Sequence, residues 1–162
     1  MKEKVFQLEI AKSFKYLYPK GVYIKIPDSY GNACFSAVKY IDAIFFYKKK
    51  FYGLEYKQIR EPKAFPKNQL NDVQRETLAN ISANDGFAYV VINYRFGRGK
   101  TRTDVAIFLS YDEFVGLEAK FQKRKSIPYK AVMGYGVKIE YTRVKDSDNS
   151  LKIWNLQEFL AS

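Results

Sequence analysis

With 162 residues the chain is long enough for one domain, and hydrophobic residues, which make up 47% of it, can fill a core. Its 28 Lys and Arg residues against 17 Asp and Glu residues give a net charge of +11, which favours a polyanionic partner; a basic surface that only keeps the protein in solution is the alternative. The absence of histidine and the single cysteine, Cys34, exclude Ser-His-Asp and Cys-His hydrolysis, zinc sites built from these residues and an internal disulfide. We expect Cys34 to be core or loop filler.

No segment at the start of the chain resembles a signal peptide, and the longest apolar runs, such as Ala88–Ile92, are too short to span a bilayer. We therefore expect a cytoplasmic protein without a membrane partner, located in the host cytoplasm if a phage encodes it. Hydrolytic chemistry in this chain has to use carboxylates, lysine, tyrosine or a hard metal ion such as Mg²⁺, which prefers oxygen ligands.

The predicted elements alternate between helices and strands along the chain. Apolar spacing predicts a first helix over residues 3–17, ended by Gly21, and the polar residues 27–39 predict an extended excursion. The predicted strands are Val22–Ile26, Ile41–Tyr47, Phe51–Gln58, Phe87–Tyr94, Asp104–Leu109 and Val137–Thr142, and the later helices are 70–83, 111–121 and 154–160. This order predicts an α/β fold with one central mixed sheet, in a single domain of residues 1–162.

Two apolar segments, Ile41–Tyr47 and Phe51–Gln58, flank three consecutive lysines and predict a β-hairpin with a lysine-rich turn. The second segment contains Glu55 and Lys57, whose side chains share one face because they are two residues apart. Asp42 lies inside the first apolar run, where a carboxylate is costly to bury without a partner.

If the hairpin turns about Lys49, Asp42 lies opposite Tyr56, within a tolerance of one residue, and reaches the neighbourhood of Glu55 and Lys57. Two carboxylates that close repel each other unless a cation lies between them, which indicates a Mg²⁺ site. A lysine beside the cation can orient or deprotonate an attacking water, or stabilise developing negative charge. The alternative is an ordinary salt-bridged polar face of two strands.

Two glycine-rich stretches contain no nucleotide-binding motif. Gly97-Arg98-Gly99-Lys100 lacks the spacing of a phosphate-binding loop and predicts a hairpin turn, and Gly134 and Gly136 flank another turn-like stretch.

Asp42, followed thirteen residues later by Glu55-Tyr56-Lys57, resembles the D-(x)n-E-x-K core of the PD-(D/E)xK nuclease superfamily. More narrowly, most of the chain resembles the RecU-type Holliday junction resolvases. The motifs that carry this resemblance are YIDAIFFYKKKFYGLEYK, Phe65-Pro66, Gln74, GFAYVVINY, KSIP at Lys125–Pro128 and the segment Gly136–Ile139.

The resemblance implies a restriction-endonuclease-like fold, with a central mixed sheet flanked by helices. It also implies a homodimeric endonuclease of DNA recombination and repair, dependent on Mg²⁺ or Mn²⁺, that cuts branched DNA at four-way junctions. Its products would carry 5′-phosphate and 3′-hydroxyl ends.

Carried over position by position, the resemblance implies that Asp42, Glu55 and the carbonyl of Tyr56 bind the metal, with Gln74 helping the site. Lys57 would act on the nucleophilic water or on the transition state.

Further candidates lie outside the hairpin core. Glu9 matches the catalytic acid of the first helix in this superfamily, with Glu3 as the alternative, and Asp28 is a second-line acid. Tyr40 stands two positions before the acid, where the family normally has threonine.

Basic residues around the motif are expected to contact the phosphate backbone, which gives affinity without reading sequence. They are Lys48, Lys49, Lys50, Arg60, Lys63, Lys67 and Arg75, and the aromatic candidates for stacking at an opened junction are Tyr30, Tyr47 and Phe65. Two alternatives stay open: a nuclease of the same superfamily that acts on flaps, ends or duplexes, and a non-catalytic DNA-binding protein whose carboxylates are structural.

Overall fold

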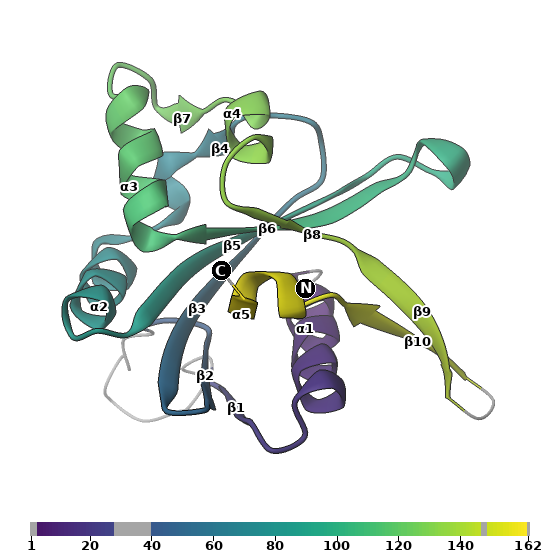
Figure 1. The fold of residues 1–162 in the computed structure, drawn as a ribbon. Helices are drawn as coiled ribbons and strands as arrows, with labels where there is room; N and C mark the ends of the chain where they lie inside the picture. The colour runs from purple at the N-terminus through teal and green to yellow at the C-terminus, as the bar shows by residue number, and fades with distance from the viewer. Residues whose placement is uncertain (1–2, 28–39, 147–148, 162) are drawn as a thin grey trace, which may run out of the picture.

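The computed structural model describes residues 3–27, 40–146 and 149–161. Its main strands are β1 (Val22–Lys25), β2 (Ala43–Tyr47), β3 (Lys50–Ile59), β5 (Phe87–Phe96), β6 (Thr103–Ser110) and β8 (Val137–Ile139). They form a six-stranded sheet in the order β1-β2-β3-β5-β6-β8, in which β3 and β5 run parallel and the other neighbours antiparallel (Figure 1). Two short sheets accompany it, one pairing β4 (Phe65–Pro66) with β7 (Ser126–Ile127), the other pairing β9 (Tyr141–Asp146) with β10 (Asn149–Trp154).

Helices cover both faces of the sheet. They are α1 (Glu3–Leu17), α2 (Asp72–Ala83), α3 (Tyr111–Lys120), α4 (Tyr129–Met133) and α5 (Gln157–Ala161), with the 3-10 turns η1 (Lys67–Gln69) and η2 (Gly99–Thr101). Both α2 and α3 begin with a capping box, in which the residue before the helix and the third helical residue exchange hydrogen bonds. The predicted mixed sheet flanked by helices is confirmed.

Strand alternation divides the core into two layers. On one face Tyr52, Leu54 and Tyr56 of β3 pack with apolar residues of α1 and α5. On the other face residues of β5 and β6, such as Val90 and Ile107, pack with α2, α3 and α4. Glu55 and Lys57 alternate with the first set along β3, so they point to the α2 side.

The largest differences from the prediction concern the C-terminal part. The strand predicted over Val137–Thr142 is divided between β8 and β9, and the helix predicted from Trp154 begins only at Gln157. Trp154 instead ends β10, where its backbone N–H donates to the Ser13 hydroxyl at 2.9 Å and its ring packs edge-on against Phe6. A pairing with α1 and β9, remote in sequence, overrides the local helical pattern.

Two long hairpins project beyond the packed body of the protein (Figure 1). One joins β5 to β6 and carries η2 at its end; the other joins β9 to β10. Gly97-Arg98-Gly99-Lys100 lies in the first, so the predicted hairpin turn is confirmed.

Candidate active site

The turn between β2 and β3 sets the register that positions the acidic residues. Lys48 and Lys49 both adopt positive φ angles, 47° and 65°, as the two central residues of a tight hairpin turn do. Tyr47 therefore pairs with Lys50, and Ala43 with Leu54. The ladder ends at this pair, and beyond it the Asp42 backbone N–H donates to the Leu54 carbonyl at 3.1 Å. The predicted turn about Lys49 is wrong, because the turn is centred between Lys48 and Lys49, which shifts the hairpin register by one residue, within the tolerance of the prediction.

Glu55 is the centre of a compact polar group on the α2 side of the sheet. Its side chain is 1% exposed, and its Oε1 accepts a hydrogen bond of 2.6 Å from the amide nitrogen of Gln74 on α2. The same oxygen lies 2.7 Å from the Lys57 ammonium nitrogen, whose side chain is 14% exposed. The site is therefore buried at the carboxylate, with the lysine partly accessible to solvent.

The capping box of α2 fixes the orientation of the Gln74 amide. Its oxygen accepts the backbone N–H of Asn71 at 3.1 Å, and the Asn71 side chain accepts the backbone N–H of Gln74 at 2.9 Å. With the oxygen engaged at the helix start, the NH₂ group faces Glu55. The sequence pattern Asn-x-x-Gln at Asn71–Gln74 carries this signal, which our sequence reasoning did not use.

Asp42 is held by the backbone of the opposite strand. Its side chain is buried, and its Oδ2 accepts the backbone N–H of Tyr56 at 2.8 Å. The Tyr56 side chain points to the other face, where its hydroxyl lies 3.2 Å from that of Tyr23, and burial raises the pKa of Tyr23 to about 12. Tyr56 thus contacts the acidic residues through its backbone and not through its hydroxyl. Both phenols, of Tyr23 and Tyr56, stay protonated at neutral pH.

The donor chemistry at this site fits a hard divalent cation. Asp42 and Glu55 are almost fully buried, and Asp42 accepts the backbone N–H of Tyr56, the residue next to Glu55. The ionised forms of two carboxylates in such surroundings are favoured by a nearby positive charge beyond that of Lys57. In the described part of the chain no three side chains of His, Cys, Asp or Glu gather as a metal-binding group. Neutral oxygens, of an amide, a backbone carbonyl or water, would therefore complete the coordination.

Glu9 does not join this group. It belongs to α1, on the opposite face, where its carboxylate contacts Arg95, Lys152 (3.1 Å) and the indole N–H of Trp154 (3.2 Å). Asp104, which our sequence reasoning missed, lies in the same cluster and contacts Lys152 at 2.6 Å. Glu3 has no described side chain, and Asp28, Tyr30 and Cys34 lie outside the described residues.

Two of the basic residues expected to contact DNA are engaged inside the protein. The Arg75 guanidinium binds both carboxylate oxygens of Glu118 at 2.6 and 2.8 Å and also donates to the Lys67 carbonyl. The Lys67 ammonium donates to the carbonyls of Glu118 and Phe121 near the end of α3. Both side chains thus tie α2 and η1 to α3. Phe65 is fully buried, so it is not available for stacking on a base.

The other basic residues divide between the two ends of the β2–β3 hairpin. Arg60 and Lys63 are exposed and follow β3 at the end nearer Lys57, where Lys63 makes a long ion pair of 3.4 Å with Glu61. Lys48, Lys49 and Lys50 surround the turn, and Lys50 lies five residues, or roughly 17 Å, from Glu55 along β3.

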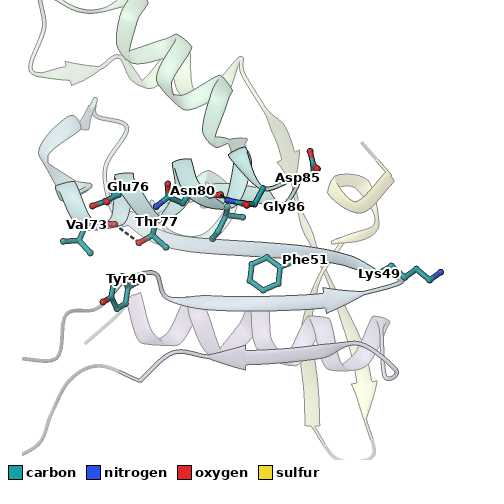
Figure 2. A pocket seen from close by; sticks show the side chains of 11 residues that line it. Tyr40, Lys49, Phe51, Val73, Glu76, Thr77, Asn80, Asp85 and Gly86 are labelled. Carbon is teal, nitrogen blue, oxygen red and sulfur yellow. Dashed lines mark hydrogen bonds between the residues drawn. The ribbon is translucent and has the colours of Figure 1, made fainter.

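An open groove of about 780 Å³ separates α2 from the β2–β3 hairpin. Figure 2 shows Tyr40 towards one end of the groove and Lys49 towards the other, with Val73 and Thr77 of α2 along its side. Tyr40 is 57% exposed and precedes Asp42 by two residues in the chain, but Asp42, Glu55, Lys57 and Gln74 do not line the groove. The lysine turn is therefore at the far end of the groove, not around the carboxylates as expected.

Among the described residues no helix combines the length and the apolar composition needed to cross a bilayer. No sequence match to a curated protein is found. A solved structure of Hjc, a Holliday junction resolvase from the archaeal hyperthermophile Archaeoglobus fulgidus, is similar over 65% of this chain and 77% of its own, with 15% identity and a TM-score of 0.38. The family model of RecU, recombination protein U, matches residues 10–147. With most of its length matched, the chain belongs to the RecU family.

Proposed function

We propose that this protein is a metal-dependent endonuclease that resolves four-way DNA junctions. The observation that carries the proposal is that the Gln74 amide nitrogen and the Lys57 ammonium nitrogen lie 2.6 and 2.7 Å from the Glu55 carboxylate. Asp42 accepts the backbone N–H of Tyr56, the residue next to Glu55, at 2.8 Å. Membership of the recombination protein U family supports a role in recombination. The net charge of +11 suits a nucleic-acid substrate.

Asp42, Glu55 and the Tyr56 carbonyl would hold the cation, Mg²⁺ or Mn²⁺. When bound, such an ion lowers the pKa of a water ligand and neutralises charge that develops on the phosphate. Gln74 contributes by donating a hydrogen bond to one carboxylate oxygen of Glu55. This hydrogen bond fixes the orientation of the carboxylate, and with it the direction of the second oxygen.

Lys57 would act on the attacking water. Its ammonium lies 2.7 Å from Glu55 and reaches solvent, so it can hold a water oxygen beside the carboxylate and stabilise negative charge on the phosphate as the water attacks. The water oxygen would bond to phosphorus and lose a proton to solvent while the bond from phosphorus to the 3′ oxygen breaks. The 3′ oxygen would take up a proton from solvent, leaving a 5′-phosphate and a 3′-hydroxyl.

Exposed cations on either side of the site would bind the backbone of the substrate. Arg60 and Lys63 lie at one end of the hairpin, and Lys48, Lys49 and Lys50 lie at the other. Phosphate contacts of this kind give affinity that is independent of base sequence, which suits an enzyme that recognises the shape of a junction.

Two symmetric cuts require two sites, so we expect a twofold homodimer. Exposed apolar side chains offer two surfaces for its interface. One lies on α1, with Val5 and Leu8 exposed by 47% and 54%, and the other on the neighbouring strands β1 and β2, with Ile24 and Phe46 exposed by 49% and 47%.

The experiment compares cleavage of a four-way junction, a flap and a linear duplex with and without Mg²⁺. Wild type should cut the junction in preference to the other substrates, and only with the metal. Asp42→Asn, Glu55→Gln and Lys57→Ala should each lower the single-turnover rate on the order of a thousandfold, because each removes a metal ligand or the group facing the water. Junction binding should persist in all three.

Retained Mg²⁺-dependent cleavage in both carboxylate variants would exclude this site. Preferred cutting of flaps or duplex would indicate a nuclease of another specificity, and binding without cleavage by wild type would indicate a DNA-binding protein with structural carboxylates.

A further inference from the structure

The end of the β5–β6 hairpin is a basic projection that the proposed active site does not use. We call residues Gly97–Arg102 the basic tip; their sequence is GRGKTR, and all six are exposed. Figure 1 shows the hairpin extending well beyond the sheet, with η2 at its end. The tip contains three cations and no acidic residue.

The backbone of the basic tip has a defined shape. The Arg98 carbonyl accepts hydrogen bonds from the backbone N–H and the hydroxyl of Thr101, and the Gly99 carbonyl accepts the backbone N–H of Arg102. Gly97 has a φ of 77°, and a Cβ there would lie 2.4 Å from the Thr101 carbonyl oxygen, so only glycine fits. The cations are therefore presented from a preformed turn, which lowers the entropic cost of binding.

Two of the three cations are available to a ligand. Arg102 pairs with Asp104 at 3.2 Å, at the base of the tip. Neither Arg98 nor Lys100 forms an ion pair with any residue that the structure describes. Arg98 and Lys100 are thus two exposed cations, two residues apart on a hydrogen-bonded turn, that have no ion-pair partner among the described residues. Their charge matches that of neighbouring phosphates.

The register of the sheet relates the basic tip to the acidic group. Glu55 pairs with Val90 in the parallel ladder, and Ile59 with Tyr94, so β5 continues past the end of β3 in the direction of Arg60. Arg98 is eight residues beyond Val90, or roughly 25 Å along the strand direction. At 3.4 Å per base pair, this spans about seven base pairs of duplex.

We propose that the basic tip binds the phosphate backbone of a duplex arm, about seven base pairs from the phosphate that is cut. This inference rests on the proposed function, since it takes the acidic group as the point of cleavage. Arg98 and Lys100 contact phosphates, Arg60 and Lys63 lie between them and the site, and the tip aligns one arm with the carboxylates. Its contacts involve no base edges, so they add affinity and orientation without sequence preference.

The test compares wild type with Arg98→Gln/Lys100→Gln in EDTA, where binding is measured without cleavage. The substrates are junctions with arms of 15 base pairs and junctions with arms of 5 base pairs closed by loops. Lys12→Gln/Lys15→Gln is the matched control, because it removes two exposed positive charges from α1, which packs on the opposite face of the sheet.

On long arms the tip variant should bind about tenfold more weakly, and the slope of log K against log salt should fall by about 2. On short arms it should bind like wild type, because the arm ends before it reaches the tip. The single-turnover cleavage rate at saturating protein should be unchanged, since the tip does not touch the reacting phosphate.

An unchanged salt slope, an equal loss on short and long arms, or an equal loss in the α1 control would overturn the proposal. A wild-type protein that binds the junction but cuts nothing contradicts the proposed function, and the binding comparison then still decides whether the tip contacts DNA. A wild-type protein without affinity for DNA overturns both.

Discussion

At the scale of single residues, Gln74 connects the start of a helix to the acidic group. One end of its amide completes the capping box with Asn71, and the other donates to Glu55 at 2.6 Å. The same side chain thus stabilises α2 and holds a buried carboxylate. The two functions can be separated by a substitution that keeps the hydrogen bond to Asn71 but replaces the attraction to Glu55 with repulsion.

Gln74→Glu is that substitution, since a glutamate at this position can still accept the Asn71 N–H. It places a second negative charge beside Glu55 in a buried site, so the melting temperature in EDTA should fall by about 5 °C, which corresponds to roughly 1–2 kcal/mol for a domain of this size. Added Mg²⁺ should raise the melting temperature of the variant more than that of wild type. Thermal unfolding with a Mg²⁺ titration measures both effects.

Asn80→Asp is the control, because it adds the same charge at an exposed position of α2. Its stability should be close to wild type and no more dependent on Mg²⁺. Equal Mg²⁺ responses of wild type and Gln74→Glu would show that no cation is bound beside Glu55.

At the scale of elements, a partly buried cluster of charges joins the β9–β10 hairpin to the rest of the fold. Asp104 of β6 binds Lys152 of β10 at 2.6 Å and Arg95 of β5 at 3.0 Å. Glu9 of α1 contacts the same two cations, and the Lys152 ammonium also lies 4.0 Å from the centre of the Tyr141 ring. Charged side chains of α1, β5, β6 and β10 thus meet in one network, with the Tyr141 ring of β9 beside it.

The protonation of Asp104 links this network to pH. Burial alone would raise the pKa of Asp104, but hydrogen bonds from Lys152 and Asn93 and the charge of Arg95 outweigh it and hold the pKa below its ordinary value of 3.8. In Lys152, by contrast, the loss of hydration dominates and lowers the pKa despite its ion pairs. Because the pKa of Asp104 is lower in the folded state, its stabilisation is complete above the unfolded value and is lost as pH falls through the folded one.

Asp104→Asn should therefore lower the free energy of unfolding by about 3 kcal/mol at pH 7, because it removes the most buried carboxylate of the network and leaves Arg95 and Lys152 with Glu9 as their remaining shared anion. The gap to wild type should shrink as the pH falls below 4, where wild type also loses this carboxylate. Urea unfolding between pH 7 and pH 3 measures this difference in the free energy of unfolding.

The control is Glu140→Gln, which alters a carboxylate that is 66% exposed and paired with Lys138. It should change the free energy of unfolding by less than about 0.5 kcal/mol. A gap that is constant with pH would contradict the role given to Asp104.

At the scale of the whole molecule, the proposed function requires two active sites acting on one junction. A twofold dimer presents the same surface from each subunit, so the two acidic groups are related by the symmetry of the junction. Each subunit then makes one cut, and loss of one site should convert a double cut into a single one.

A heterodimer of wild type and Asp42→Asn, isolated through two different affinity tags, tests this arrangement. On a supercoiled plasmid with an extruded cruciform, the wild-type dimer should yield linear DNA and the heterodimer nicked circles. Linear product from the heterodimer, or a monomeric mass for wild type at micromolar concentration, would contradict a dimer with one site per subunit.

Local sequence information determined the features that depend on neighbouring residues. Alternation along β3 placed Glu55 and Lys57 on one face, apolar spacing predicted α1 with its observed bounds, and three lysines marked the turn before β3. These features follow from the two-residue and 3.6-residue periods of strands and helices, which a sequence displays directly. The D-(x)n-E-x-K motif can likewise be recognised from the sequence alone.

Tertiary structure decided what depends on contacts between remote segments. It set the hairpin register through the φ angles of Lys48 and Lys49, directed Glu9 to the cluster around Asp104, and engaged Arg75 with Glu118. It also made Trp154 the end of a strand, against its local helical pattern. A charged side chain has the same sequence signature whether it binds a phosphate or a carboxylate of its own chain, and only the packing of α1, α3 and β10 against the sheet distinguishes the two.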